Sequence, residues 1–160
     1  MEPCRIRVLS ENEYPLLKKF LYLAVFVPEG MTPPEEEITE LPEMRVYTDD
    51  FGKRKGDYCL AAECAGEVVG LVWTRIMNDY GHMDDRTPSF AISLLPEFRG
   101  RGIGTAMMKE MLQTLKRNGY EQASLSVQKE NHPAVSMYRS LGFIRIEDRG
   151  EEDLMICRLA

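Results

Sequence analysis

Residues 94–105 of the chain read Leu94-Leu95-Pro96-Glu97-Phe98-Arg99-Gly100-Arg101-Gly102-Ile103-Gly104-Thr105. The run before them, from Ser89 to Leu95, has the apolar character of a buried strand, and Pro96 ends it. Beyond the glycines, apolar residues recur at helical spacing: Ile103, Met107, Met108, Met111, Leu112 and Leu115. This stretch therefore predicts a buried strand, a glycine-rich turn and an amphipathic helix.

A glycine-rich turn that leads into a helix is suited to binding an anion. Glycine lets the backbone approach a ligand closely, and a helix N-terminus offers unpaired N–H groups with a partial charge of about +0.5. Four or five hydrogen bonds to a charged group, at about 1.5–3 kcal/mol each, could supply most of the roughly 8 kcal/mol of micromolar binding. A pyrophosphate fits this site, although Arg99 and Arg101 could also be solvated loop charges.

Two well-known nucleotide-binding patterns do not match these residues. A P-loop requires a lysine after its last glycine, whereas Gly104 is followed directly by Thr105. The dinucleotide fingerprint requires glycine at its sixth position, which is Thr105 when counting starts at Gly100. The next predicted strand also ends in Val127-Gln128 and not in an acidic residue.

The remaining elements follow from periodicity, capping and turn residues. Strands are predicted at residues 5–9, 58–64, 68–77, 89–95, 123–127, 143–149 and 154–159. Helices are predicted from the capping box of Ser10 and Glu13 to Pro28, from Pro42 to Phe51, from Ile103 to Gly119, and from Pro133 to Gly142. The order β-α-α-β-β-β-α-β-α-β-β indicates an α/β (α+β) fold, with a mixed central sheet covered by helices on both faces.

Length and charge exclude several classes of protein. A chain of 160 residues predicts one domain, 1–160, and its net charge of -6 argues against nucleic-acid binding. The longest apolar stretch, Leu16 to Val27, contains Lys18 and Lys19 and is too short for a membrane span. The first residues, Met1 to Cys4, do not resemble a secretory signal, so we expect a cytoplasmic location.

The cysteines and histidines offer little for metal binding. Four cysteines, Cys4, Cys59, Cys64 and Cys157, form no C-x-x-C pair, which favours reduced, buried thiols. The two histidines, His82 and His132, are fifty residues apart in the sequence. We therefore expect no metal site.

Two motifs give the chain a resemblance to the GNAT N-acetyltransferase family. Arg99 to Gly104 matches the pattern Q/R-x-x-G-x-G/A of the family's acyl-coenzyme A loop. A second pattern, N-x-x-A-x-x-x-Y-x-x-x-G-F, is matched downstream by Asn131, Ala134, Tyr138, Gly142 and Phe143. The predicted order of elements also resembles this family's fold, although both motifs lie between Leu94 and Phe143.

The resemblance implies the GNAT acyl-CoA N-acyltransferase fold, in which the cosubstrate acetyl-coenzyme A enters a splayed sheet between the strand ending at Leu95 and strand 123–127. Backbone groups of Leu94 and Leu95 would pair with its pantetheine arm, and the Leu94 N–H would bond the thioester carbonyl oxygen. The pyrophosphate would be held by the amides of Arg99, Gly100, Arg101, Gly102, Ile103, Gly104 and Thr105.

Two residues of the second motif receive roles from the same resemblance. Asn131 would contact the pantetheine arm, although it could also cap the following helix. Tyr138 would act as general acid for the departing thiolate, although at this spacing it could be an ordinary core aromatic. Trp73, the single tryptophan, could line the acceptor pocket or simply pack.

The implied activity is transfer of an acetyl group from acetyl-coenzyme A to a primary amine of a small molecule or peptide, by direct attack in a ternary complex. A noncatalytic acyl-coenzyme A sensor is the alternative, and a homodimer is one oligomeric state open to the chain. Deprotonating an alkylammonium of pKa about 10.4 at pH 7 costs roughly 4.6 kcal/mol, so a base is needed. The candidates are Glu29, Glu63, Asp79, His82, Asp84 and Asp85.

Overall fold

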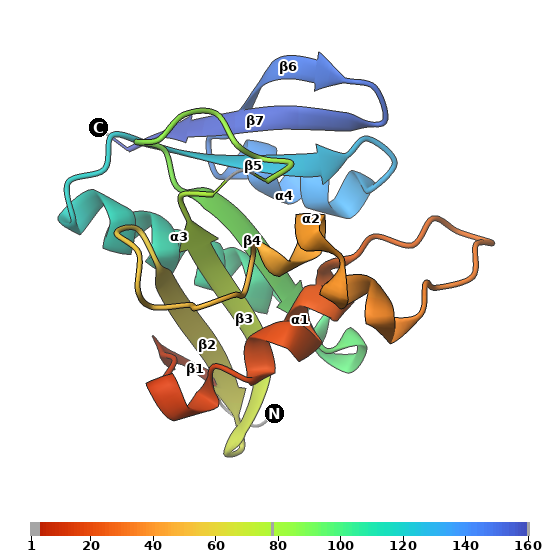
Figure 1. Cartoon of the computed structure of the whole chain (residues 1–160), viewed down its shortest axis with the longest axis vertical. Helices are drawn as coiled ribbons and strands as arrows, with labels where there is room; N and C mark the ends of the chain where they lie inside the picture. The colour runs from red at the N-terminus through yellow and green to blue at the C-terminus, as the bar shows by residue number, and fades with distance from the viewer. Residues whose placement is uncertain (1–3, 78, 160) are drawn as a thin grey trace.

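The computed structural model describes residues 4–77 and 79–159. Met1 to Pro3, used above to judge the start of the chain, and Asn78, at the start of a predicted loop, lie outside the described residues. The centre of the fold is a seven-stranded sheet (Figure 1). Its strands are β1 (Cys4–Val8), β2 (Tyr58–Cys64), β3 (Glu67–Arg75), β4 (Ser89–Leu94), β5 (Gln122–Gln128), β6 (Ile144–Arg149) and β7 (Glu152–Arg158).

The strand order is β1-β2-β3-β4-β5-β7-β6. Every neighbouring pair is antiparallel except β4 and β5, which are parallel. A right-handed crossover is the usual solution for such a parallel pair, and here the connection carries a long helix. The mixed sheet predicted from the sequence is thus confirmed.

In the described residues, four α-helices and three short 3-10 helices accompany the sheet. They are η1 (Glu11–Glu13), α1 (Leu16–Ala24), η2 (Glu36–Glu40), α2 (Pro42–Arg45), η3 (Pro96–Phe98), α3 (Ile103–Arg117) and α4 (His132–Ser140). Figure 1 shows α1 and α2 on one face of the sheet and α3 and α4 on the other. The sheet therefore separates two helical layers, one formed by the first half of the chain and the other by the second half.

Each layer has its own hydrophobic core. On the α3 side, the buried methionines Met107, Met108 and Met111 pack against alternate residues of the strands. On the α1 side, Phe20 and Trp73 are fully buried in a second cluster. Along β4, Phe90 and Ile92 belong to the first core and Ala91 to the second, as the two-residue period of a strand requires.

Two helices are shorter than predicted. The capping-box pair is formed, with the Ser10 N–H donating to the Glu13 carboxylate at 3.0 Å, but it closes only a 3-10 turn. Pro15 has no N–H to continue that turn as an α-helix, so α1 begins at Leu16. The helix predicted to reach Phe51 ends at Arg45, because the carbonyls of Val46 and Asp49 accept hydrogen bonds from Arg75.

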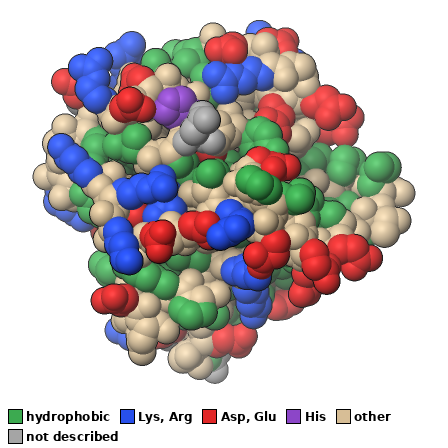
Figure 2. Space-filling model, viewed as in Figure 1, with side chains coloured by type: hydrophobic (Ala, Val, Ile, Leu, Met, Phe, Trp, Pro, Cys, Tyr) green, Lys and Arg blue, Asp and Glu red, His purple; other side chains and the backbone are tan. Residues whose placement is uncertain are grey.

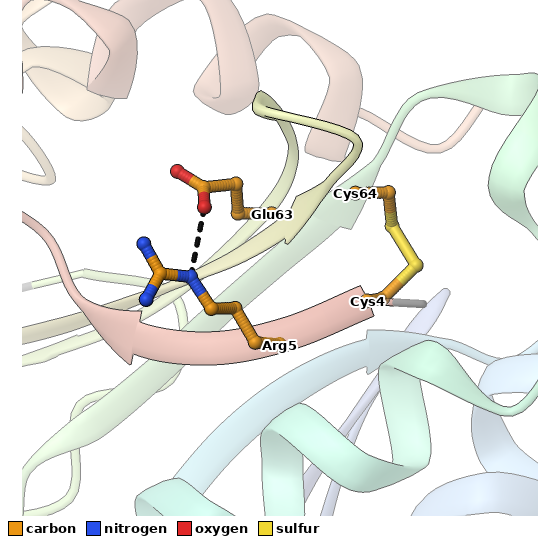
Figure 3. The surroundings of a disulfide bond; sticks show 4 residues. All are labelled: Cys4, Arg5, Glu63 and Cys64. Atoms are coloured by element: carbon orange, nitrogen blue, oxygen red, sulfur yellow. Dashed lines mark hydrogen bonds and ion pairs between the residues drawn. A yellow bond between two sulfur atoms is a disulfide. The ribbon is translucent and has the colours of Figure 1, made fainter. Parts of the chain in front are cut away.

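The expectation that all four cysteines are reduced is wrong for two of them. Cys4 and Cys64 form a disulfide with a Cα–Cα distance of 4.2 Å (Figure 3). Antiparallel pairing of β1 with β2 places them directly opposite each other, although 60 residues separate them in the sequence. Cys59 and Cys157 are buried free thiols, as predicted.

The helices in the described parts of the chain were compared with the length and hydropathy of a membrane span. None of them is long and apolar enough to cross a bilayer.

Candidate active site

The sheet splits between its two parallel strands. The register between β4 and β5 pairs one residue of each, Ser89 with Ser124, and the Ser124 N–H donates to the Pro88 carbonyl at 2.9 Å. Beyond this point the strands diverge towards Leu94 and Gln128, as Figure 1 shows. We call this arrangement the β4–β5 fork. It has the splayed form that the resemblance implied.

Backbone groups of β4 face the fork. The Leu95 N–H donates to the Val69 carbonyl of β3 at 2.8 Å. Because hydrogen-bonding direction alternates along an antiparallel ladder, the next residue back, Leu94, points its N–H and C=O away from β3 and towards β5. The Leu94 carbonyl accepts a bond from Arg99 Nε at 3.3 Å. Leu94 therefore offers its N–H to the fork, whereas the N–H of Leu95 is already used.

The glycine turn lies at the open end of the fork. Gly100 and Gly102 have φ of 74° and 83°, in the left-handed region that only glycine enters at little cost. A side chain placed on either residue would meet no atom of the described chain within 4 Å. Exposed space therefore lies in front of the turn, and a ligand could approach the backbone there.

Helix α3 supplies donors to the same space. Its ladder begins with the Ala106 N–H donating to the Gly102 carbonyl at 3.1 Å. The N–H groups from Gly102 to Thr105 precede that ladder and so have no carbonyl within the helix to bond. Gly102, Ile103, Gly104 and Thr105 thus present the type of donor that a pyrophosphate binds at a helix N-terminus.

The two arginines of the turn are exposed and differ in their contacts. Arg99 holds the Leu94 carbonyl, and Arg101 lies over the Phe98 ring at 5.1 Å. No ion pair of either guanidinium is formed with the residues at 4–77 and 79–159. Both positive charges are therefore available to an anion beside the backbone donors.

Three segments meet at Gly104. A β-carbon at this residue would lie 3.6 Å from Leu94 Cδ1 and 3.6 Å from Met137 Sδ. The structure thus brings together the end of β4, the first turn of α3, and α4, which carries Tyr138. The two motifs that lie about thirty residues apart in the sequence converge on one side of the fork.

Tyr138 is buried, with 8% of its surface exposed, and packs against Phe143 with ring centroids 5.8 Å apart. Burial raises the pKa of Tyr138 to about 12. The hydroxyl therefore keeps its proton at neutral pH, as a general acid must.

Asn131 precedes α4 at the N-cap position. Its side chain makes no capping hydrogen bond to the helix. The half-buried amide is therefore left with its donor and acceptor groups free of the capping role that the sequence also allowed.

The opposite face of β5 is polar. Ala123, Leu125 and Val127 point into the core beneath α3, so alternate residues point the other way. The Ser126 hydroxyl and Gln128 Nε2 both donate to the Glu152 carboxylate, each at 2.8 Å. The sequence reasoning missed Glu152, and the serine-serine-glutamine alternation along this strand was the available signal.

Asp79 lies at the closed end of the fork on this polar face. Ser89, the β4 residue at the fork, donates its hydroxyl to Asp79 Oδ2 at 2.8 Å. Burial raises the pKa of Asp79, and the bond from Ser89, together with the nearby Tyr47 hydroxyl and Gly81 N–H, only partly opposes the rise. A cavity of about 500 Å³ is lined here by Asp79, Tyr80, Gln128, Arg149, Glu151 and Glu152.

The other candidate bases lie in different surroundings. Glu63 bonds Arg5 and Arg7, which lower its carboxyl pKa. The backbone N–H of Arg86 lowers that of Asp84. His82 Nδ1 lies 2.7 Å from the Met77 carbonyl. Of the residues lining the cavity, Asp79 alone was among the candidates, which also included Asp85 and Glu29.

Two further side chains are now placed. Trp73 is fully buried and donates its Nε1 hydrogen to the Tyr47 carbonyl at 3.1 Å, so it packs and does not line the cavity. Among the residues that the structure describes, no group of three His, Cys, Asp or Glu side chains is arranged to hold a metal ion.

Comparison with known proteins agrees with this geometry. Residues 24–143 match the model of the Acetyltransferase (GNAT) family. The chain is 32% identical over 88 residues to a mycothiol acetyltransferase of Pseudarthrobacter chlorophenolicus, a match covering 55% of this chain and 27% of that protein. The chain thus spans only about a quarter to two-fifths of the mycothiol acetyltransferases it resembles.

Solved structures share the whole fold. A GNAT-family acetyltransferase from Streptococcus pneumoniae superposes with a TM-score of 0.72 at 17% identity, covering 99% of this chain and 100% of that one. An N-acetyltransferase from Thermoplasma acidophilum, in complex with coenzyme A, gives 0.70 at 18% identity, covering 98% and 99%. With its family model matched over most of its length, this chain belongs to the acetyltransferase (GNAT) family.

Proposed function

We propose that residues 1–160 form one N-acetyltransferase domain that moves an acetyl group from acetyl-coenzyme A to a primary amine. One observation carries this proposal: a left-handed glycine turn and the free N–H groups of α3 lie at the open end of the β4–β5 fork. A phosphate site and an opening in the sheet are both required for a long cosubstrate whose reactive end must reach the interior.

The residues present fit acetyl-coenzyme A. The amides of Gly100 to Thr105 would hold its pyrophosphate, aided by the charges of Arg99 and Arg101. The Arg99 N–H is not among these donors, because it is bonded to the Pro96 carbonyl at 3.2 Å. Leu94 would bond through its N–H, which faces the fork, and Asn131 would contact the pantetheine arm. We now assign Leu95 no donor role, because its N–H is bonded to Val69. The cosubstrate supplies an acyl group activated as a thioester.

Tyr138 is proposed as the general acid. Its raised pKa keeps the phenol protonated, and its place on α4, next to Met137 at the glycine turn, puts it on the cofactor side of the sheet. A thiol of pKa about 8.5 is already a fair leaving group, so this proton accelerates the reaction without being indispensable. The acceptor amine attacks directly in a ternary complex, with no covalent enzyme intermediate.

The acceptor is a small molecule or a peptide. Relatives named for mycothiol share only part of their length with this chain, so their acceptor is not carried over. The proposal also keeps the cytoplasmic location, although the Cys4–Cys64 disulfide is a bond more often found in oxidising compartments. Cell fractionation with thiol trapping would decide between the two.

The test is calorimetric titration with acetyl-coenzyme A, dephospho-coenzyme A and pantetheine. Micromolar binding that requires the pyrophosphate would support the assignment of the glycine turn. Release of free thiol on adding an amine then separates an enzyme from the alternative, a noncatalytic sensor, which would bind but not turn over. Absence of any binding would refute both.

A further inference from the structure

We infer that Asp79 is the general base of this site, that Glu152 binds a cationic group of the acceptor, and that the acceptor therefore enters the cavity beside the fork as a positively charged amine. This inference rests on the proposed function, because it names the acceptor side of the same reaction. It concerns the face of the sheet opposite to Tyr138 and α3.

The first argument is the position of Asp79. Its carboxylate is held by Ser89, the residue at which β4 and β5 are still paired. The cavity is lined by Asp79 and by Gln128, the last residue of β5. The Asp79 carboxylate therefore lies between the β4–β5 fork and the cavity, where an acceptor could meet the cofactor side.

The second argument is the unused oxygen of Asp79. Its Oδ2 atom accepts the bond from Ser89, whereas Oδ1 is buried and has no hydrogen-bond partner among the described residues. A buried carboxylate oxygen without a partner carries a desolvation cost that a bound donor would relieve. The ammonium group of an acceptor is such a donor.

The third argument is the charge of the cavity. The carboxylates of Asp79 and Glu152 form no ion pair with the described Lys and Arg side chains. Glu152 is held in place by two neutral donors, Ser126 and Gln128, which orient it without cancelling its charge. Arg149, the one cation of the lining, is bonded to Glu147 and to the Tyr80 carbonyl.

Further carboxylates add to this negative charge. Glu151 lines the same cavity. Figure 2 shows Asp and Glu side chains gathered at the right of the view. Elsewhere on the surface, the exposed residues Glu35, Glu36 and Glu37 line a second hollow with Tyr22. Carboxylates of one sign raise the local concentration of cations and disfavour acceptors that carry a carboxylate of their own.

The reaction then balances as follows. Asp79 takes one proton from the ammonium and later releases it to solvent. The nitrogen forms its bond to the acyl carbon as the carbon–sulfur bond breaks. Tyr138 gives one proton to the departing sulfur. The nitrogen loses a second proton in forming the amide, and this loss compensates for the proton given by Tyr138. The products are an amide, a free thiol and one proton.

The experiment uses the full chain and three amines with four carbons each: 1,4-diaminobutane, 1-aminobutane and 4-aminobutanoate. With saturating acetyl-coenzyme A, we expect kcat/KM to fall in that order, by about tenfold or more from first to last. Equal or reversed values would overturn the assignment of the cavity. If none is acetylated, binding is measured instead by NMR. We expect the backbone amide chemical shifts of Ser126, Gln128 and Glu152 to change when 1,4-diaminobutane is added to the coenzyme A complex. Unchanged shifts would contradict the inference.

Three variants separate the roles. Asp79→Asn is expected to lower kcat by at least about 100-fold. Glu152→Gln is expected to raise the KM for 1,4-diaminobutane about tenfold while kcat changes little. Asp50→Asn, an exposed residue outside the cavity, is the control and should behave as the unmodified chain.

Coenzyme A affinity is measured for all three variants, so that failure of this inference is distinct from failure of the proposed function. Normal affinity together with an unchanged kcat in Asp79→Asn would refute the base. Absence of coenzyme A binding by the unmodified chain would instead refute the proposed function itself.

Discussion

The two sides of the β4–β5 fork offer a ligand different kinds of chemical group. On the α3 side the groups available to a ligand are mainly backbone N–H groups, displayed by two glycines with positive φ and by the start of a helix. On the α2 side they are side-chain carboxylates, Asp79 and Glu152, oriented by hydroxyl and amide groups of β4 and β5. One side offers partial positive charge and the other offers full negative charge.

In the proposed function, this difference lets one opening take two unlike molecules. A backbone site is tied to the fold, because every residue except proline has the same N–H group, so it suits a constant cosubstrate. A side-chain site can be changed by single substitutions without moving the backbone, so it suits a variable acceptor. The following predictions test this division.

The largest effect is expected from Gly102→Val. A β-branched residue resists the left-handed conformation at φ 83°, so the turn must change shape, and affinity for acetyl-coenzyme A should fall at least about 100-fold by calorimetry. Gly119→Val is the matched control, since Gly119 has φ of 86°, equally open space and a position at the other end of α3. Equal losses of affinity in both variants would mean that general strain, and not the turn, governs binding.

Tyr138→Phe tests the cofactor side at its chemical step. We expect kcat to fall about 10- to 100-fold, because a proton donor is removed, while coenzyme A affinity changes less than about threefold. A stopped assay of thiol release would show this fall in kcat. Since the pKa of Tyr138 is raised to about 12, activity should also show no alkaline loss from this group up to about pH 10. An unchanged kcat would mean that Tyr138 is an ordinary core aromatic and not the general acid.

Ser126→Ala tests the support beneath Glu152. Removing one of its two neutral donors should loosen the carboxylate and raise the amine KM about threefold, with kcat and coenzyme A affinity unaffected. Thr114→Ala, on the exposed surface of α3, serves as its control because that hydroxyl bonds only within the helix region. A change in kcat as large as the change in KM would argue against a purely binding role.

The smallest effect concerns stability. Burial raises the folded-state pKa of Asp79 above its unfolded value of about 3.9, so ionised Asp79 costs stability at neutral pH. Asp79→Asn should therefore raise Tm by about 2 °C at pH 7, since 1 kcal/mol shifts Tm by about 2–4 °C at this size. The gain should vanish below about pH 3, where Asp79 is protonated in both the folded and the unfolded state. If calorimetry showed a lower Tm for Asp79→Asn than for the unmodified chain at pH 7, the idea that the buried Asp79 charge costs stability would be wrong.

That stability change depends on the groups around Asp79. Tyr47 lies beside it, while Tyr80, Glu151, Glu152 and Arg149 line the same cavity. The Glu152→Gln background removes a neighbouring carboxylate from the cavity, so adding Asp79→Asn to it isolates the contribution of Asp79.

The sequence predicted the local structure of the glycine turn far better than that of the polar cavity. In the turn from Arg99 to Gly104 a strand end, glycines and a helix start follow one another, so adjacent residues determine its geometry. The polar cavity joins Asp79, Gln128 and Glu152 from three distant segments. Their meeting depends on the register of β7 with β5, which no local pattern specifies.

The same reason explains the errors. Cys4 and Cys64 meet only because β1 pairs with β2 in one register, and sequence spacing gave no sign of it. The helix predicted to continue to Phe51 was stopped by Arg75, a residue from a strand that comes later in the chain. The start of α1 at Leu16 is different, because there the adjacent Pro15 was the cause and the error was local.

Trp73 gives the molecule a built-in optical probe. It is the single tryptophan of the chain, it is sealed from water, and its indole N–H is bonded to the carbonyl of Tyr47, whose side chain lies beside Asp79. Its fluorescence should therefore respond to an amine that enters the cavity and remain nearly constant when a pyrophosphate docks beyond the sheet. Occupancy of the two sides could then be followed separately in one cuvette, without a label.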